Sequence, residues 1–174
     1  MATQNLSAHD LIFGDLEREL AVTRTVLERL PEEKFAWKPH EKSMNLGRLA
    51  MHVATMPDWA KTTIAQDGLD MATAPRPRVE PTDKKDLLAE FDKCANELRA
   101  AVKNFDATRI GDPWTIRNGS HVMATRPKAM IYRVWCINHM VHHRAQLCLY
   151  LRLLNVPVPA VYFNSADEPD WKFD

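Results

Sequence analysis

Apolar residues that recur at helical spacing are the feature that most constrains how this chain can fold. The recurrence is found in four long stretches, at about residues 7–30, 45–66, 83–105 and 127–154. In each stretch Leu, Ile, Val and Phe gather on one face at a period near 3.6, which predicts an amphipathic helix. Pro31 follows the first stretch and Pro157 follows the last, where each ends a helix. The pattern predicts an all-α chain of four helices.

Two connections between these helices carry further information. Residues 68–82 contain three prolines, and about 15 extended residues span roughly 50 Å, more than the roughly 30 Å of a 20-residue helix. The linker can therefore cross over and leave the second and third helices parallel, as in some four-helix bundles. Asn118-Gly119 lies between two short β-leaning runs within residues 114–123. This predicts a small β-hairpin before the last helix, packed over one end of the bundle.

Composition limits the classes of partner. The chain has 174 residues, enough for a single domain over residues 1–174. Lys and Arg number 23, Asp and Glu number 23, and this balance argues against nucleic acid and against a polybasic membrane anchor. No run approaches the roughly 18 apolar residues of a spanning helix, and no secretory signal opens the chain. Three cysteines without paired spacing add to the expectation of a cytoplasmic protein.

Two histidines of the predicted last helix share one face. His139 and His143 are four residues apart, so their side chains lie one above the other. The same face carries Tyr132, Cys136, Met140, Leu147, Tyr150 and Leu154. Both imidazoles should therefore point into the core, which is unfavourable unless something satisfies both rings. A shared divalent metal is the common solution, and His-x-x-x-His is the spacing of many helical zinc sites.

A metal needs at least one further ligand. His52 is the best candidate, because it lies in an apolar stripe near the core side of the second helix, with Leu49, Met56 and Trp59. Cys136, one turn before His139, is its rival as a thiolate ligand, and Gln146 could support a ligating histidine by a hydrogen bond. On spacing alone, an interpretation without metal fits the sequence as well as a metal site does. In that interpretation the histidine pair is structural, His52 is half-buried, and the three cysteines only fill the core.

The order of motifs resembles a known family. A lone histidine in the second helix is followed by Asn-His-Met-Val-His-His-Arg-Ala-Gln-Leu at residues 138–147. The resemblance extends to the hairpin at 114–123, the segment 150–159, Tyr162 and residues 165–168. Together they resemble the DinB/YfiT-like family of damage-inducible helical proteins, which is unrelated to the DNA polymerase that shares the label. Ala145 stands where the family usually has Gly, and Phe163-Asn164 where related chains tend to have Gly-Pro.

The resemblance implies a four-helix bundle, often a homodimer, with a divalent metal held by three histidines. By position these are His52, His139 and His143. Three neutral nitrogen ligands suit zinc or nickel and leave a coordination position open. Similar bundles include transferases for thiols such as bacillithiol or mycothiol, and a thiol-dependent maleylpyruvate isomerase. The leading hypothesis is therefore a metal-dependent thiol S-transferase whose partners are a small thiol and an electrophile, without nucleic acid or membrane.

Three other hypotheses remain open on the sequence. The same metal could activate water in a hydrolase, with Asp58, Asp167 or Glu168 as candidate bases. A non-catalytic, stress-related metal-binding protein would favour a fourth protein ligand such as Cys136. An interaction module without metal predicts histidines that point apart. The exposed faces of the first and last helices show no obvious apolar excess, so the homodimer rests on the resemblance.

Overall fold

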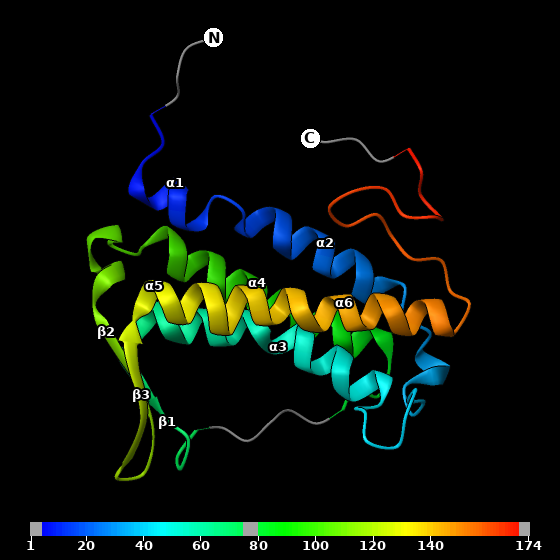
Figure 1. Cartoon of the computed structure of the whole chain (residues 1–174), viewed down its shortest axis with the longest axis horizontal. Helices are drawn as coiled ribbons and strands as arrows, with labels where there is room; N and C mark the ends of the chain where they lie inside the picture. The colour runs from blue at the N-terminus through cyan, green and yellow to red at the C-terminus, as the bar shows by residue number, and fades with distance from the viewer. Residues whose placement is uncertain (1–4, 75–79, 171–174) are drawn as a thin grey trace.

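Helices make up most of the computed structural model, which describes residues 5–74 and 80–170 (Figure 1). The α-helices are α1 (Ala8–Phe13), α2 (Leu16–Glu28), α3 (Leu46–Ala65), α4 (Lys84–Lys103), α5 (Lys128–Met130) and α6 (Asn138–Leu153). Two 3-10 turns, η1 (Glu32–Lys34) and η2 (Ala107–Gly111), and the π-helical segment η3 (Ile131–Ile137) accompany them. The strands are β1 (Gly68–Asp70), β2 (Pro113–Asn118) and β3 (His121–Pro127). The fold is thus mostly helical with one small sheet.

The first predicted helix is in fact two helices. Ser7 caps α1 through the capping box with Asp10, but α1 ends before Gly14 and α2 begins at Leu16. Gly14 explains the break, because a Cβ atom at this position would collide with the carbonyl oxygen of Asp10. The prediction of one continuous helix over residues 7–30 is therefore wrong, although the segment is helical on both sides of the break.

Helices α3 and α4 run in the same direction, as the long linker predicts. At their beginnings, Asn45 caps α3 and donates from Nδ2 to the carboxylate of Glu80, which lies just before α4. At their ends, β1 follows α3, β2 follows α4 shortly after, and the two strands pair in parallel with Gly68 opposite Thr115. Part of the linker, residues 75–79, lies outside the described residues. Figure 1 shows both helices leading to the sheet at one end of the molecule.

The sheet has three strands in the order β1-β2-β3, and β2 pairs with β3 in antiparallel register. Asn118 pairs with His121, so the connecting loop is Gly119-Ser120, one residue later than the predicted Asn-Gly turn. Gly119 has φ of 60°, a conformation that glycine adopts without strain. Strand β1 was not expected, since three residues are too short to show an alternating pattern.

The last predicted helix changes its winding before the histidines. Over η3 the backbone is π-helical, and the Asn138 N–H bonds to the carbonyl of Arg133, five residues earlier. Regular α-helix resumes at Asn138 and continues to Leu153. Tyr132 and Cys136 are buried as predicted, while Val134 and Trp135 are exposed. The π-helical segment thus ends two residues before His139, and such segments are frequent next to functional sites.

Two buried cations fix the last helical segment against its neighbours. The Lys128 ammonium donates to the carbonyls of Thr63 and Gln66 at the end of α3, and the Arg144 guanidinium pairs with Glu19 of α2 at 2.8 Å. Charged side chains are rarely buried without such partners. The two contacts therefore fix the rotation of the last helical segment, from α5 to α6, about its own axis. Among the described helices, none combines the length and the apolar character needed to cross a membrane.

Candidate metal centre

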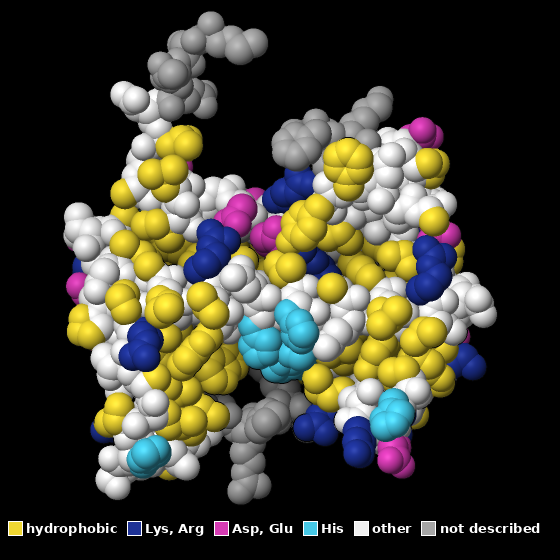
Figure 2. Space-filling model, in the orientation of Figure 1, with side chains coloured by type: hydrophobic (Ala, Val, Ile, Leu, Met, Phe, Trp, Pro, Cys, Tyr) yellow, Lys and Arg dark blue, Asp and Glu magenta, His cyan; other side chains and the backbone are white. Residues whose placement is uncertain are grey.

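The structure brings His52, His139 and His143 together between α3 and α6. One ring nitrogen from each histidine lies within 4.8 Å of the other two. The ring centroid of His52 is 4.6 Å from that of His143 and 5.3 Å from that of His139. Figure 2 shows histidine side chains gathered near the middle of this face, over the beginning of α6. The interaction-module hypothesis, in which these histidines point apart, is therefore wrong.

Hydrogen bonds orient the two histidines of α6. The Nδ1 atom of His139 lies 3.3 Å from the carbonyl oxygen of Trp135, and Nδ1 of His143 lies 2.7 Å from Oε1 of Gln146. Both oxygens can only accept, so each Nδ1 carries the hydrogen and each Nε2 carries a lone pair when the rings are neutral. The two Nε2 atoms lie 2.8 Å apart. Two lone pairs facing each other at this distance repel, and a cation bound between them would relieve the repulsion.

A proton on His143 or His52 is a poor candidate for that cation. Burial lowers the pKa of His143 more than the hydrogen bond with Gln146 raises it, and the neighbouring His139 and His142 lower it further. Burial also lowers the pKa of His52 to about 4, and His143 and His139 again contribute. Desolvation and mutual repulsion disfavour the charged form of both rings, so both are neutral at pH 7. Neutral imidazoles with free Nε2 lone pairs are the form in which histidine binds a metal.

The donor set fits a divalent transition metal. A tetrahedral zinc ion bound at about 2.0–2.1 Å keeps its nitrogen ligands roughly 3.3 Å apart, so small side-chain rotations suffice. No Cys, Asp or Glu of residues 5–74 and 80–170 joins the three histidines in this group. Three protein ligands leave a position open, whereas structural zinc sites are closed by four.

Cys136 does not compete for this position. Its side chain is buried, and Sγ lies 3.6 Å from Oγ1 of Thr63 rather than in the histidine group. Burial raises the pKa of the Cys136 thiol to about 11, so the thiol is protonated at neutral pH. The interpretation of Cys136 as a rival ligand is wrong, because the π-helical turn and α3 enclose it in the core.

Comparison with known proteins identifies the family. The sequence model of the DinB family matches residues 1–172. The chain belongs to the DinB family. None of the curated proteins compared with the chain matches it. The DinB resemblance that the sequence motifs predict is therefore confirmed.

Solved structures of DinB-like proteins share the fold. A DinB-like protein from Bacillus cereus ATCC 10987 has a TM-score of 0.69 at 19% identity, covering 87% of this chain and 95% of its own. One from Bacillus subtilis has a TM-score of 0.64 at 17% identity, covering 84% and 95%. A DinB family protein from Exiguobacterium sibiricum 255-15 has a TM-score of 0.58 at 17% identity, covering 93% and 97%. At these identities the likeness concerns the fold.

The three candidate bases of this DinB chain lie outside the histidine group. Asp58 pairs with Lys61 on the same helix. Asp167 accepts from Arg152 and from the Val158 N–H, while Glu168 accepts from Arg29 and from the Ala160 N–H. The last two carboxylates therefore fasten the C-terminal segment to α2 and α6, and this role is structural.

Two contacts around the histidines involve residues that sequence reasoning had only partly singled out. Gln146 holds His143 through Oε1, as its angle on the helix predicts, and its Nε2 also contacts Nε2 of His142 at 3.2 Å. The carbonyl of Trp135 was not foreseen as a partner of His139, because backbone acceptors leave no residue signature. His142 itself is exposed and lies outside the three-histidine group.

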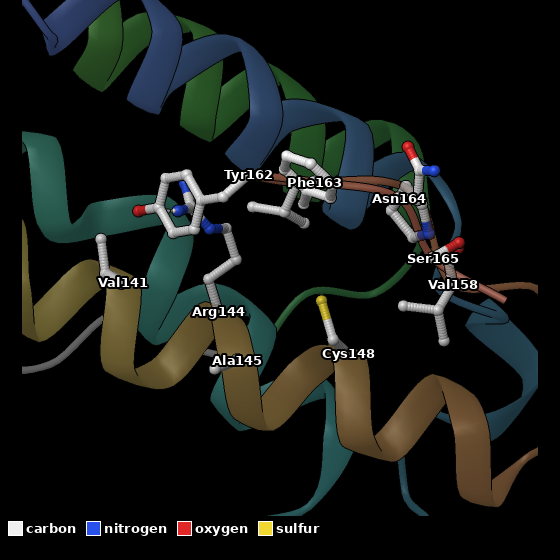
Figure 3. A pocket seen from close by; sticks show the side chains of 11 residues that line it. Val141, Arg144, Ala145, Cys148, Val158, Tyr162, Phe163, Asn164 and Ser165 are labelled. Atoms are coloured by element: carbon white, nitrogen blue, oxygen red, sulfur yellow. Dashed lines mark hydrogen bonds between the residues drawn. The ribbon is translucent and has the colours of Figure 1, made fainter. Parts of the chain in front are cut away.

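An apolar pocket lies on a different face of α6 from the histidines of this DinB chain. It has a volume of about 340 Å³ and is lined by α6 and the C-terminal segment. Figure 3 shows Arg144 directed toward Tyr162, while Cys148 lies beside the pocket. Burial raises the pKa of the Cys148 thiol, which disfavours the nucleophilic thiolate. Arg144 is held by Glu19 and Tyr162, so its role here is structural as well.

Proposed function

We propose that His52, His139 and His143 of this DinB four-helix bundle hold a divalent metal, zinc or nickel. The support is the convergence of three imidazoles, two of which, on α6, already have acceptors for their Nδ1–H groups. Metal-ligating histidines almost always donate their other ring N–H in this way, which fixes the tautomer and the ring orientation.

We propose further that the centre serves thiol transfer from a low-molecular-weight thiol to an electrophilic small molecule. The observation that carries this proposal is the set of only three protein ligands within the described residues. A divalent metal bound there lowers the pKa of an incoming thiol and so supplies thiolate at neutral pH. The histidines keep the metal in place, while Gln146 and the Trp135 carbonyl hold the two α6 rings in their ligating tautomers.

The alternatives have weaker support. A hydrolase needs a base beside the metal, and the three candidate carboxylates are engaged elsewhere or lie outside the histidine group. A non-catalytic stress-related metal protein would be favoured by a closed site, and Cys136 does not close it. We therefore rank thiol transfer first.

Metal analysis tests the centre. Protein purified without an affinity tag should contain about one equivalent of metal, and His52→Ala should lose it. His121→Ala is the matched control, because His121 lies exposed on β3. Less than about half an equivalent, unchanged by His52→Ala, would overturn the site.

An activity assay tests the reaction separately. Zinc- or nickel-loaded protein should transfer several small thiols to a generic electrophile faster than His143→Ala loaded in the same way. Equal rates for the two proteins would exclude thiol transfer at this centre while leaving metal binding intact.

We also propose that the protein is a cytoplasmic homodimer. Its three cysteines, Cys94, Cys136 and Cys148, are free, as expected in a reducing compartment. Contrary to the sequence expectation, α1 and the last helical segment do expose apolar side chains, among them Leu11, Met130, Val134 and Leu149. Figure 2 shows hydrophobic side chains over much of the face that it draws. A second copy of the chain could cover them. Light scattering that gives a monomer mass would exclude the dimer.

A further inference from the structure

A polar pocket lies at the beginning of α3, one helical turn before His52. Its volume is about 560 Å³, and its walls come from residues 36–48 and from Glu80 before α4. Five charged side chains line it: Lys38, Lys42, Arg48, Glu41 and Glu80. This pocket is distinct from the apolar pocket beside the C-terminal segment.

Arg48 connects the pocket with the metal centre. Arg48 and His52 are four residues apart on α3, so they are neighbours on one face of the helix. Arg48 is also close enough for its charge to contribute to the lowered pKa of His52. Figure 2 shows basic side chains below the central histidine group on the same face.

The pocket is lined by three basic and two acidic side chains, and some of them have partners within the protein. Glu80 accepts from Nδ2 of Asn45 at 3.1 Å. Lys38 donates to the backbone carbonyl of Glu41. Among the described residues, neither the Arg48 guanidinium nor the Lys42 ammonium has a hydrogen-bonded acceptor or an ion-pair partner. Two free cationic groups therefore line this polar cavity, and one of them, Arg48, lies one helical turn from His52.

A bound metal ion would add to the positive charge of this pocket. Three neutral histidines leave both positive charges of a divalent ion uncompensated, and a single thiolate neutralises only one. A second negative charge on the same ligand would meet Arg48, whose planar guanidinium suits a carboxylate.

We propose that the thiol used at this centre is anionic and that Arg48, with Lys42, binds its carboxylate. This inference rests on the proposed thiol chemistry and names its substrate class: a low-molecular-weight thiol that also carries a carboxylate. The apolar pocket behind α6 takes no part in binding it.

Calorimetry on zinc-loaded protein tests this assignment. The probes are 3-mercaptopropionate and its methyl ester, which differ in one negative charge. The ratio of their dissociation constants is compared among wild type, Arg48→Gln and Arg126→Gln, because the two thiols also differ in acidity. Arg126→Gln is the matched control, since Arg126 is an exposed arginine of β3 outside the pocket. Equal zinc content in all three proteins shows that the metal centre is intact.

We expect Arg48→Gln to reduce the preference for 3-mercaptopropionate by about tenfold, the effect of one charge-assisted hydrogen bond. Binding of the ester should stay within about twofold, and Arg126→Gln should behave as wild type. An unchanged ratio in Arg48→Gln, with both thiols still bound, overturns the carboxylate site and leaves the metal-thiol proposal standing. If zinc-loaded wild type binds neither thiol, the proposed function fails, and this inference fails with it.

Discussion

Oε1 of Gln146 lies 2.7 Å from Nδ1 of His143, while Nε2 of Gln146 lies 3.2 Å from Nε2 of His142. The amide oxygen can only accept, so it fixes the hydrogen of His143 on Nδ1 and leaves Nε2 to face His139. Gln146 thereby determines which nitrogen of His143 is free to bind a metal.

Replacing Gln146 should weaken metal binding without removing a ligand. We expect Gln146→Ala to raise the dissociation constant for zinc by about tenfold or more, as is typical when the partner of a ligating histidine is lost. Gln146→Glu should restore the affinity, because a carboxylate also accepts from Nδ1. The measurement is competition with a chromophoric chelator. His142→Ala is the control, and an equal loss in that variant would contradict the role given to Gln146.

Zinc should stabilise the folded protein. A ligand that binds only the folded state at about 100 times its dissociation constant adds about 2.7 kcal/mol to the free energy of unfolding. For a chain of this size we expect the melting temperature to rise by roughly 5–10 °C. Differential scanning fluorimetry with and without zinc measures the shift. His143→Ala should abolish it and His121→Ala should keep it; a full shift in His143→Ala would mean that zinc binds elsewhere.

The buried ion pair between Arg144 and Glu19 should be costly to break on one side. Their side chains are 2% and 6% exposed, and Thr23 also accepts from Arg144. Glu19→Gln leaves a buried guanidinium without its counter-ion, so the free energy of unfolding should fall by about 3–5 kcal/mol. Urea unfolding measures the loss.

A control and a double variant sharpen this test. Arg99→Met removes an ion pair with Glu17 whose side chains are 40% and 68% exposed, and it should cost less than about 1 kcal/mol. Glu19→Leu combined with Arg144→Met should be less destabilising than the sum of the two single changes. If Glu19→Gln costs no more than Arg99→Met, the buried pair does not fix α6 as proposed.

The parts of this fold that the sequence predicts are those with a local signature. The 3.6-residue period placed the helical stretches, and the four-residue spacing of His139 and His143 put both on one face. His52 followed from its place in an apolar stripe, although it lies 87 positions before His139 in the sequence. These features are visible because each depends on residues within one helix.

The remaining features depend on contacts between distant segments or on backbone atoms. Strand β1 exists because β2 supplies its hydrogen bonds, and three residues show no period of their own. The π-helical turn places the Trp135 carbonyl beside His139, and a carbonyl carries no residue identity. Arg144 and Glu19 are brought together by packing of α6 on α2, so neither sequence neighbourhood reveals the pair.

The C-terminal segment should loosen in acid. The Arg152 guanidinium and the Val158 N–H lower the pKa of Asp167, while the Ala160 N–H and Arg29 lower that of Glu168. Groups with lowered folded-state pKa values contribute stability that is fully present above the ordinary carboxyl pKa. That contribution is lost as the pH falls through the lowered values. We therefore expect hydrogen-exchange protection factors of the Val158 and Ala160 amides to fall together below the usual carboxyl range, as measured by NMR.

Asp167→Asn should reduce protection of Val158 already at neutral pH, because a neutral amide accepts more weakly than a carboxylate. Protection that stays constant into strong acid in the wild type would show that the two carboxylates do not hold the segment.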